Sequence, residues 1–421
     1  MPDSRWIDSR LAAARPRAVA ALLRYFRDLD LAEEAFQEAC LRALSKWREN
    51  GPPRDAAAWL IMVGRNVTLD HVRRQSRLTE LPEEGLVSAE EDVEDDLATR
   101  LDDSHYRDDI LRLMFTCCHP DLPATQQVAL ALRVVSGLSV AQIARTFLVN
   151  ERAMEQRIVR AKARIAQTGI AFEAPGPVER AERLAAVSTM IYLVFNEGYS
   201  DSSPDSERAS LCDEGIRLAR LLLRLFPSEP EMMGLLALML LSHSRQRARF
   251  DHAGSLILLE KQDRSLWDQN LITEALAMID KAMLHRRPGR YQIQAAIAAL
   301  HAQARRAEDT DWVGIDQLYA ALERLDSSPV VTLNRAVAVS KVRGAHEALK
   351  LVEPLAEPLS GYFYFHGLRG ALLQQLGRKR EAREALNRAI GLAATAAEAA
   401  HIREHLDQLE AGTGTGARAE N

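Results

Sequence analysis

The stretch from Leu122 to Ile165, LPATQQVALALRVVSGLSVAQIARTFLVNERAMEQRIVRAKARI, decides the fold of the first half of the chain. Its apolar residues recur at helical spacing until Gly137 ends the first helix. Ser139 and Gln142 have the spacing of a capping box, which predicts a second helix over residues 140–147. The pattern predicts a four-helix unit that ends in a helix-turn-helix.

The last helix of this unit follows Asn150, a residue suited to capping it, and carries an excess of positive charge. Its cations are Arg152, Arg157, Arg160, Lys162 and Arg164, with Glu155 and Gln156 between them. Its apolar residues, three or four apart, are Met154, Ile158, Ala161 and Ile165. This spacing turns the charges outward. A basic helix of this kind favours DNA binding over an ordinary solvated helix.

Two further helices are predicted upstream. Residues 27–47 form an amphipathic helix whose acidic face consists of Asp30, Glu33, Glu34 and Glu38, opposite Leu31, Ala35, Ala39 and Leu44. Residues 53–77 form a helix whose second half is basic and contains Arg65, Arg73, Arg74 and Arg77. Trp59 lies in an apolar run and is predicted to be a core residue rather than a surface on which bases stack. The pair suits a protein partner on one side and nucleic acid on the other, although each helix alone is equally consistent with a solvated face.

The order of three segments resolves this ambiguity. AEEAFQEACLRAL (32–44), AWLIMVGRNVTLDHVRR (58–74) and LPATQQVALALRVVSGLSVAQIA (122–144), followed by the basic helix, resemble a bacterial RNA polymerase sigma factor of the extracytoplasmic-function type. The resemblance covers about residues 10–170. It implies an all-α fold with sigma region 2 at residues 1–78, an acidic linker at 79–108 and a region 4 helix-turn-helix at 109–170.

The resemblance also implies a role for individual residues. The expected contacts to core polymerase are Asp30, Glu33, Glu34, Gln37 and Glu38. The expected readers of the −10 element are the loop at residues 51–55, with Arg54, and Arg65, Asn66, Asp70, Arg73 and Arg74. The expected readers of the −35 element are Arg152, Glu155, Gln156 and Arg157, whose side chains can pair with base edges in the major groove. Arg160, Lys162 and Arg164 lie further along the helix and are expected to contact phosphates.

The linker is strongly acidic. Residues 80–103 contain eleven acidic side chains and one base, Arg100. Such a run is expected to be extended when alone. The resemblance favours a segment that threads the polymerase channel for nascent RNA, and a solvated spacer is the alternative.

Composition limits the remaining possibilities. The chain has 421 residues, of which 27% are charged and 47% hydrophobic, and its net charge is −5. DNA affinity must therefore come from local basic patches. No apolar run is long enough to span a membrane and the start lacks a signal core, which predicts a cytoplasmic protein. Cys117, Cys118, His119 and Asp121 lie close together, but a second ligand pair is lacking, so buried thiols are favoured over a metal site.

The second half, residues 171–421, has an almost wholly helical pattern. Ala336 and Ala348 lie twelve residues apart, as do Gly370 and Ala382, and the pairs are offset by thirty-four residues. This period predicts tetratricopeptide-like repeats near the end. The same half resembles the long extension of one sigma-factor group, which implies a built-in regulator.

Catalysis is not favoured. Two polar clusters in the second half, at residues 196–199 and 243–252, lack the spacing of a nucleophile, phosphate-binding or metal motif. The basic run at 245–249 is instead a candidate for contact with the amino-terminal half or with nucleic acid.

The sequence thus predicts a transcription initiation factor that binds core RNA polymerase and promoter DNA, without a cofactor, an enzymatic activity or a membrane contact. One alternative is a free-standing helix-turn-helix regulator with a repeat-type sensor. Another is a scaffold protein whose basic helices are incidental.

Overall fold

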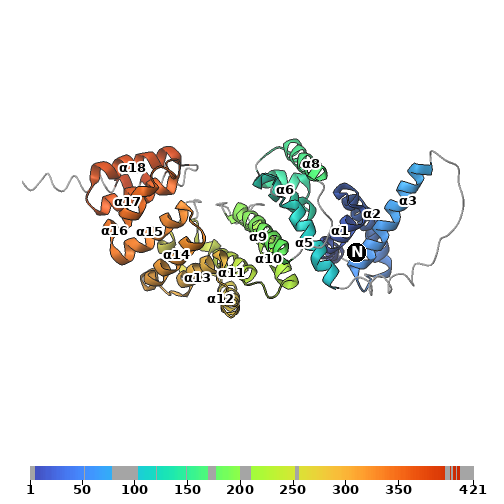
Figure 1. The fold of residues 1–421 in the computed structure, drawn as a ribbon, viewed down its shortest axis with the longest axis horizontal. Helices are drawn as coiled ribbons and strands as arrows, with labels where there is room; N and C mark the ends of the chain where they lie inside the picture. The colour runs from blue at the N-terminus through green and yellow to red at the C-terminus, as the bar shows by residue number, and fades with distance from the viewer. Residues whose placement is uncertain are drawn as a thin grey trace, which may run out of the picture. The chain divides into compact units, whose positions relative to one another are not determined.

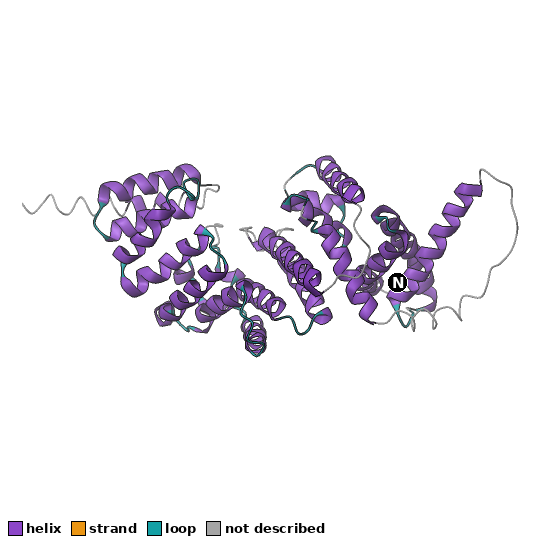
Figure 2. Ribbon diagram, viewed as in Figure 1, coloured by secondary structure: helices purple, strands orange, loops and turns teal. Residues whose placement is uncertain are grey.

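The computed structural model describes residues 5–51, 53–77, 103–119, 121–147, 149–168, 177–199, 210–251 and 256–393, with scattered positions from 399 to 407. Every regular element in these ranges is a helix, as Figure 2 shows, and this confirms the all-α prediction. One isolated antiparallel bridge joins Phe250 to Leu256. None of the described helices is long and apolar enough to cross a membrane.

The chain divides into two compact units, Met1–Asn196 and Glu197–Asn421 (Figure 1). We predicted that the extension begins at residue 171, but most of α9 (Pro177–Tyr199) belongs to the first unit. Within that unit, the Arg183 guanidinium of α9 lies 4.8 Å from the ring centroid of Phe115. The first unit therefore extends beyond the segment that resembles a sigma factor.

The first unit begins with three helices: α1 (Arg5–Phe26), α2 (Leu29–Asn50) and α3 (Ala56–Arg77). The rings of Trp47 and Trp59 pack edge to face with centroids 5.4 Å apart, and both side chains are buried. Trp59 is thus a core residue, as predicted. Gly64 allows α3 to approach α2 closely, because a Cβ atom there would lie 2.7 Å from the carbonyl oxygen of Ala35.

Four more helices follow: α5 (Asp103–Cys117), α6 (Ala124–Val134), α7 (Val140–Thr146) and α8 (Glu151–Thr168). The predicted capping box is present, because the Gln142 N–H donates to Ser139 Oγ at 3.1 Å and the Ser139 N–H donates to Gln142 Oε1 at 2.8 Å. The side chain of Asn150 accepts from the N–H of Ala153 at 2.7 Å and caps α8. The caps of α7 and α8 are therefore where we predicted them, but α7 ends at Thr146, and the described residues of Leu122–Ile165 hold three helices rather than the predicted four.

The predicted linker, residues 79–108, is corrected at its end. Residues 78–102 lie outside the described residues, and α5 already begins at Asp103. The reason is local: apolar residues recur at helical spacing after Asp103, and Ile110 and Leu113 are fully buried.

A buried charge cluster joins α1, α2 and α6. Arg15, 8% exposed, donates to Glu33 Oε1 at 3.0 Å and to the carbonyl oxygen of Val134 at 2.9 Å. Glu33 is itself only 4% exposed, so the prediction of a fully solvated acidic face is wrong at this residue. Because Glu33 follows Leu29 by four residues and precedes Phe36 by three, it falls within the buried stripe of α2.

The second unit contains nine described α-helices: α10 (Ser210–Leu225), α11 (Pro230–Ser244), α12 (Gln269–Met283), α13 (Arg290–Gln303), α14 (Trp312–Leu325), α15 (Pro329–Arg343), α16 (Ala345–Val352), α17 (Phe363–Gln375) and α18 (Lys379–Leu392). α11 packs against α10, α12 and α13, and it is apolar around almost its whole circumference. The other contacts run mainly between consecutive helices, as in a stacked series of hairpins.

The small residues that suggested a repeat are buried where helices pair. Ala336 and Ala348 lie in α15 and α16, and Gly370 and Ala382 lie in α17 and α18. A Cβ atom on Gly370 would lie 2.6 Å from a methyl carbon of Leu386, so a larger residue there would force the Leu386 side chain to shift. The two helix pairs fit the predicted period, and the tetratricopeptide-like assignment stays a prediction.

The cysteines are all free thiols. Cys117 and Cys118 are buried in α5 and just after it, and burial raises the pKa of both thiols. Burial also raises the pKa of Cys212 to about 12. Within the described ranges no group of three metal-ligating side chains comes together. The burial of Cys117 and Cys118, which are 0% and 2% exposed, agrees with the buried structural role that we predicted for them.

Replacing Glu33 is expected to destabilise the first unit. Glu33→Ala would leave the buried Arg15 without its carboxylate partner, at a cost of about 3 kcal/mol. Hydrogen exchange of α1 and α2 in the full-length chain, read at increasing urea concentration, measures this loss locally. Glu34→Ala is the matched control because Glu34 is exposed on the same turn, and its effect is expected within about 0.5 kcal/mol. Equal effects of the two changes would contradict the role assigned to the cluster.

Candidate functional site

The outer face of α8 presents polar side chains that are free to bind a ligand. Arg152, Glu155, Gln156 and Arg160 are exposed and Arg157 is half-buried. None of these five makes an ion pair or side-chain hydrogen bond with a described residue. The residues that anchor α8 to the core are Met154, Ile158, Ala161 and Ile165, as predicted.

The predicted base readers Arg152, Glu155, Gln156 and Arg157 lie in the first two turns of α8, immediately after the turn from α7. In a helix-turn-helix this is the end of the second helix that meets base edges in the major groove. Arginine and glutamine there supply bidentate donors and acceptors, and Glu155 can accept from cytosine. The geometry is therefore compatible with the predicted division between base readers and phosphate contacts.

Lys162 differs from the other cations of α8. Its ammonium lies 2.6 Å from Asp30 Oδ1 and 2.7 Å from Glu33 Oε2, both on α2. Burial acts to lower the pKa of Lys162, but the two carboxylates outweigh it and hold this pKa above its ordinary value. Lys162 is thus fully charged and already occupied by acidic partners. It must leave them before it can contact a phosphate.

The predicted polymerase-binding residues of α2 separate into two groups. Glu34, Gln37 and Glu38 are exposed, and Asp30 is exposed but paired with Lys162. Glu33 is buried among cations, of which Arg133 of α6 lies 3.8 Å away in addition to Arg15 and Lys162. Sequence analysis did not single out Arg15 or Arg133. The available signal was the position of Glu33 within the apolar stripe, which requires a buried cation nearby.

The predicted −10 readers are only partly described. Asp70, Arg73 and Arg74 lie in the last turns of α3, where the side chains are outside the described residues. Arg54, Arg65 and Asn66 are exposed. In the loop before α3, the Asp55 carboxylate accepts from the N–H groups of Ala57 and Ala58 at 2.9 and 3.1 Å, so it acts as a helix cap.

An aromatic residue that sequence analysis did not single out lies beside this group. The guanidinium of Arg65 is 4.7 Å from the ring centroid of Tyr25, and the Tyr25 side chain is 46% exposed. An exposed ring next to an arginine is a surface on which an unpaired base can stack. Because Tyr25 belongs to α1, only the tertiary structure brings it to Arg65.

The polar clusters of the second half have structural partners. The guanidinium carbon of Arg249 lies 3.6 Å from the ring centroid of Tyr199. Nη1 of Arg249 donates a hydrogen bond to the backbone carbonyl oxygen of Tyr199 at 2.5 Å. His243 lies 3.3 Å from a carboxylate oxygen of Asp213. Arg245 belongs to neither contact and lines a cavity instead. The basic run therefore does not act as one continuous surface.

Comparisons with known proteins agree with this division of the chain. Residues 11–78 match sigma-70 region 2, and residues 112–165 match sigma-70 region 4. Residues 183–283 match a family of unknown function, DUF6596. The last match begins within α9 and ends at α12.

Two relatives illustrate the extent of the similarity. The uncharacterized protein R00370 of Rhizobium meliloti (strain 1021) is 69% identical over 421 residues, which is the full length of both chains. The ECF RNA polymerase sigma factor BldN of Streptomyces coelicolor is 32% identical over 142 residues, covering 32% of this chain and 49% of BldN. Both sigma-70 regions occur in sequence order, and together with the similarity to BldN they support an ECF-type sigma factor with a long helical C-terminal extension.

Proposed function

We propose that this sigma factor binds core RNA polymerase through the exposed face of α2, reads promoter DNA through α3 and α8, and carries its own regulator in the second unit. The observation that supports promoter reading most directly is the set of unpaired polar side chains on the first half of α8. Hydrogen-bonding groups left free on a rigid, capped helix are available to base edges without rearrangement of their own contacts.

The ion pairs between α2 and α8 add a conformational step to this function. The −10 and −35 elements are centred about 25 base pairs apart, which is roughly 85 Å along B-form DNA. In the structure, Lys162 of α8 touches Asp30 and Glu33 of α2. A unit held in this way cannot read both elements at once. Polymerase binding is therefore coupled to separation of α8 from α2.

The second unit is proposed to act on this equilibrium. It is a separate compact unit with a helix stack and a cavity of its own, features suited to a sensor. A contact between the second unit and the sigma regions stays a prediction. The alternative function, a helix-turn-helix regulator that acts without polymerase, uses the same α8 face but does not require an acidic surface on α2.

Arg157→Ala is expected to weaken binding to the −35 duplex by about 1–3 kcal/mol and to relax the preference at one base position. The reason is that Arg157 has no partner among the described residues and lies where α8 is proposed to meet base edges. Fluorescence anisotropy with duplexes selected by the polymerase complex from a random library measures the change. As a control, Arg160→Ala should weaken binding similarly for all duplexes and lower the slope of the salt dependence by about one. Unchanged base preference in Arg157→Ala would contradict this assignment.

Lys162→Ala is expected to tighten the binding of core polymerase in the absence of DNA, by roughly fivefold, because it removes the pairs that hold α8 against α2. Surface-immobilised core enzyme titrated with each variant gives the affinity. Arg160→Ala is the matched control, because Arg160 lies on the same helix without a described partner. If Lys162→Ala binds core polymerase more weakly than the parent chain does, the ion pairs between α8 and α2 do not oppose polymerase binding.

Removing the second unit tests the regulatory proposal. A chain ending after Tyr199 keeps α9, whereas a cut near residue 172 would remove packing of the first unit. The full-length and shortened chains are compared in promoter-specific transcription with core polymerase, and a change of at least several-fold in either direction is expected. Equal transcription by both would contradict a regulatory role. If neither chain forms a polymerase complex, the sigma-factor proposal fails.

A further inference from the structure

The second unit contains a cavity of about 450 Å³ between α11, α13, α14 and α15. Its apolar lining includes Leu238 of α11, Ile297 of α13 and Leu322 of α14, together with Trp267 from the segment before α12. The volume lies within the range of pockets that hold small molecules. The cavity is formed entirely by residues of the second unit, so it exists independently of the sigma regions.

One residue of this cavity, Arg245 at the end of α11, is a half-buried cation without an acidic partner among the described residues. Other arginines of the unit have such partners: Arg220 pairs with Glu274, Arg335 with Asp316 and Glu323, and Arg369 with Glu353. A guanidinium that loses part of its hydration without gaining a carboxylate favours the binding of an anion.

Two other basic residues, Arg264 and His301, add to the preference for an anion. They do not compete with Arg245 for binding it. Nη1 of Arg264 donates to the carbonyl oxygens of His301 and Ala304, which holds this guanidinium against α13 and the residue after it. Burial, together with the charges of Arg245 and Arg264, lowers the pKa of His301 to about 4. The imidazole is therefore neutral at pH 7, and Arg245 supplies the free cationic donors.

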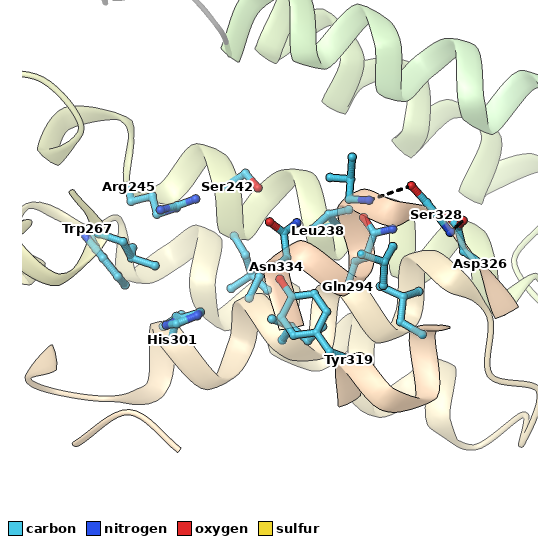
Figure 3. A pocket seen from close by; sticks show the side chains of 18 residues that line it. Leu238, Ser242, Arg245, Trp267, Gln294, His301, Tyr319, Asp326, Ser328 and Asn334 are labelled. Carbon is cyan, nitrogen blue, oxygen red and sulfur yellow. Dashed lines mark hydrogen bonds between the residues drawn. The ribbon is translucent and has the colours of Figure 1, made fainter. Parts of the chain in front are cut away.

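The other polar side chains that line the cavity indicate which chemical groups the rest of the ligand carries. Figure 3 shows Asn334 and Gln294 between Arg245 at one end and Asp326 at the other. Neither amide has a described hydrogen-bond partner, and each can both donate and accept. The Asp326 carboxylate repels a second negative group at the far end.

We propose that this cavity binds a small organic anion, with a single carboxylate or phosphate group on Arg245. Its uncharged body packs against the apolar wall and hydrogen-bonds to Asn334 and Gln294. This site goes beyond the proposed function, because ligand binding in the cavity requires neither polymerase nor DNA. If the second unit regulates the sigma regions, such an anion is a signal that it can sense.

Saturation-transfer NMR on the full-length chain tests the site with four named probes: benzoate, indole-3-acetate, phenyl phosphate and AMP. We expect saturable binding of at least one probe with a dissociation constant of about 1 mM or below. Benzyl alcohol is the uncharged control. Preferential binding of benzoate and indole-3-acetate identifies a carboxylate site, and preferential binding of phenyl phosphate and AMP identifies a phosphate site.

Two variants assign the binding to the cavity. Arg245→Gln should raise the dissociation constant of the bound probe by at least about tenfold. Arg247→Gln should leave the dissociation constant unchanged, because Arg247 is exposed and does not line the cavity. If Arg245→Gln alters the circular dichroism spectrum, Asn334→Ala replaces it, with a several-fold loss expected. The proposal is overturned if no probe saturates, if benzyl alcohol binds as well as the anions, or if the folded variant binds like the parent chain. Each of these results leaves the polymerase proposal untouched, since binding is read directly.

Discussion

The carboxylate of Glu33 is the group on which the arrangement of the first unit depends. It is buried, and a buried charge requires partners of opposite sign. Those partners come from three different helices: Arg15 from α1, Arg133 from α6 and Lys162 from α8. Because α2 belongs to sigma region 2, whereas α6 and α8 belong to region 4, one side chain links the two regions.

Because Glu33 pairs with Lys162, the two halves of α8 differ in how free their charged side chains are. The first half has free side chains on a capped, rigid helix, while Lys162 in the second half is tied to the acidic face of α2. A ligand that binds only when α2 and α8 are apart must supply the free energy needed to break the ion pairs of Lys162. Polymerase and promoter DNA each use one of the two surfaces, so their binding is cooperative under the proposed function.

The second unit follows a different plan. Several of its arginines pair with acids on neighbouring helices, as Arg220 does with Glu274, and small residues such as Gly370 let consecutive helices approach. The cavity departs from this plan, because Arg245, Asn334 and Gln294 converge there without described partners. Polar groups without protein partners are available to a ligand. The unit therefore combines a helical frame with a polar site that favours an anion.

Local patterns were sufficient to predict α2, α3, α7 and α8, the capping box at Ser139 and Gln142, the apolar anchors of α8 and the core position of Trp59, because these depend on residues close in sequence. The burial of Glu33, the stacking of Tyr25 with Arg65 and the cavity around Arg245 depend on which helices meet. Helical periodicity tells which face of a helix is apolar, but it does not tell which neighbour covers a charge. The sequence by itself determined the elements and the family. The tertiary structure decided which charged side chains are free to bind a partner and which are paired within the protein, because charge pairing depends on distance in space.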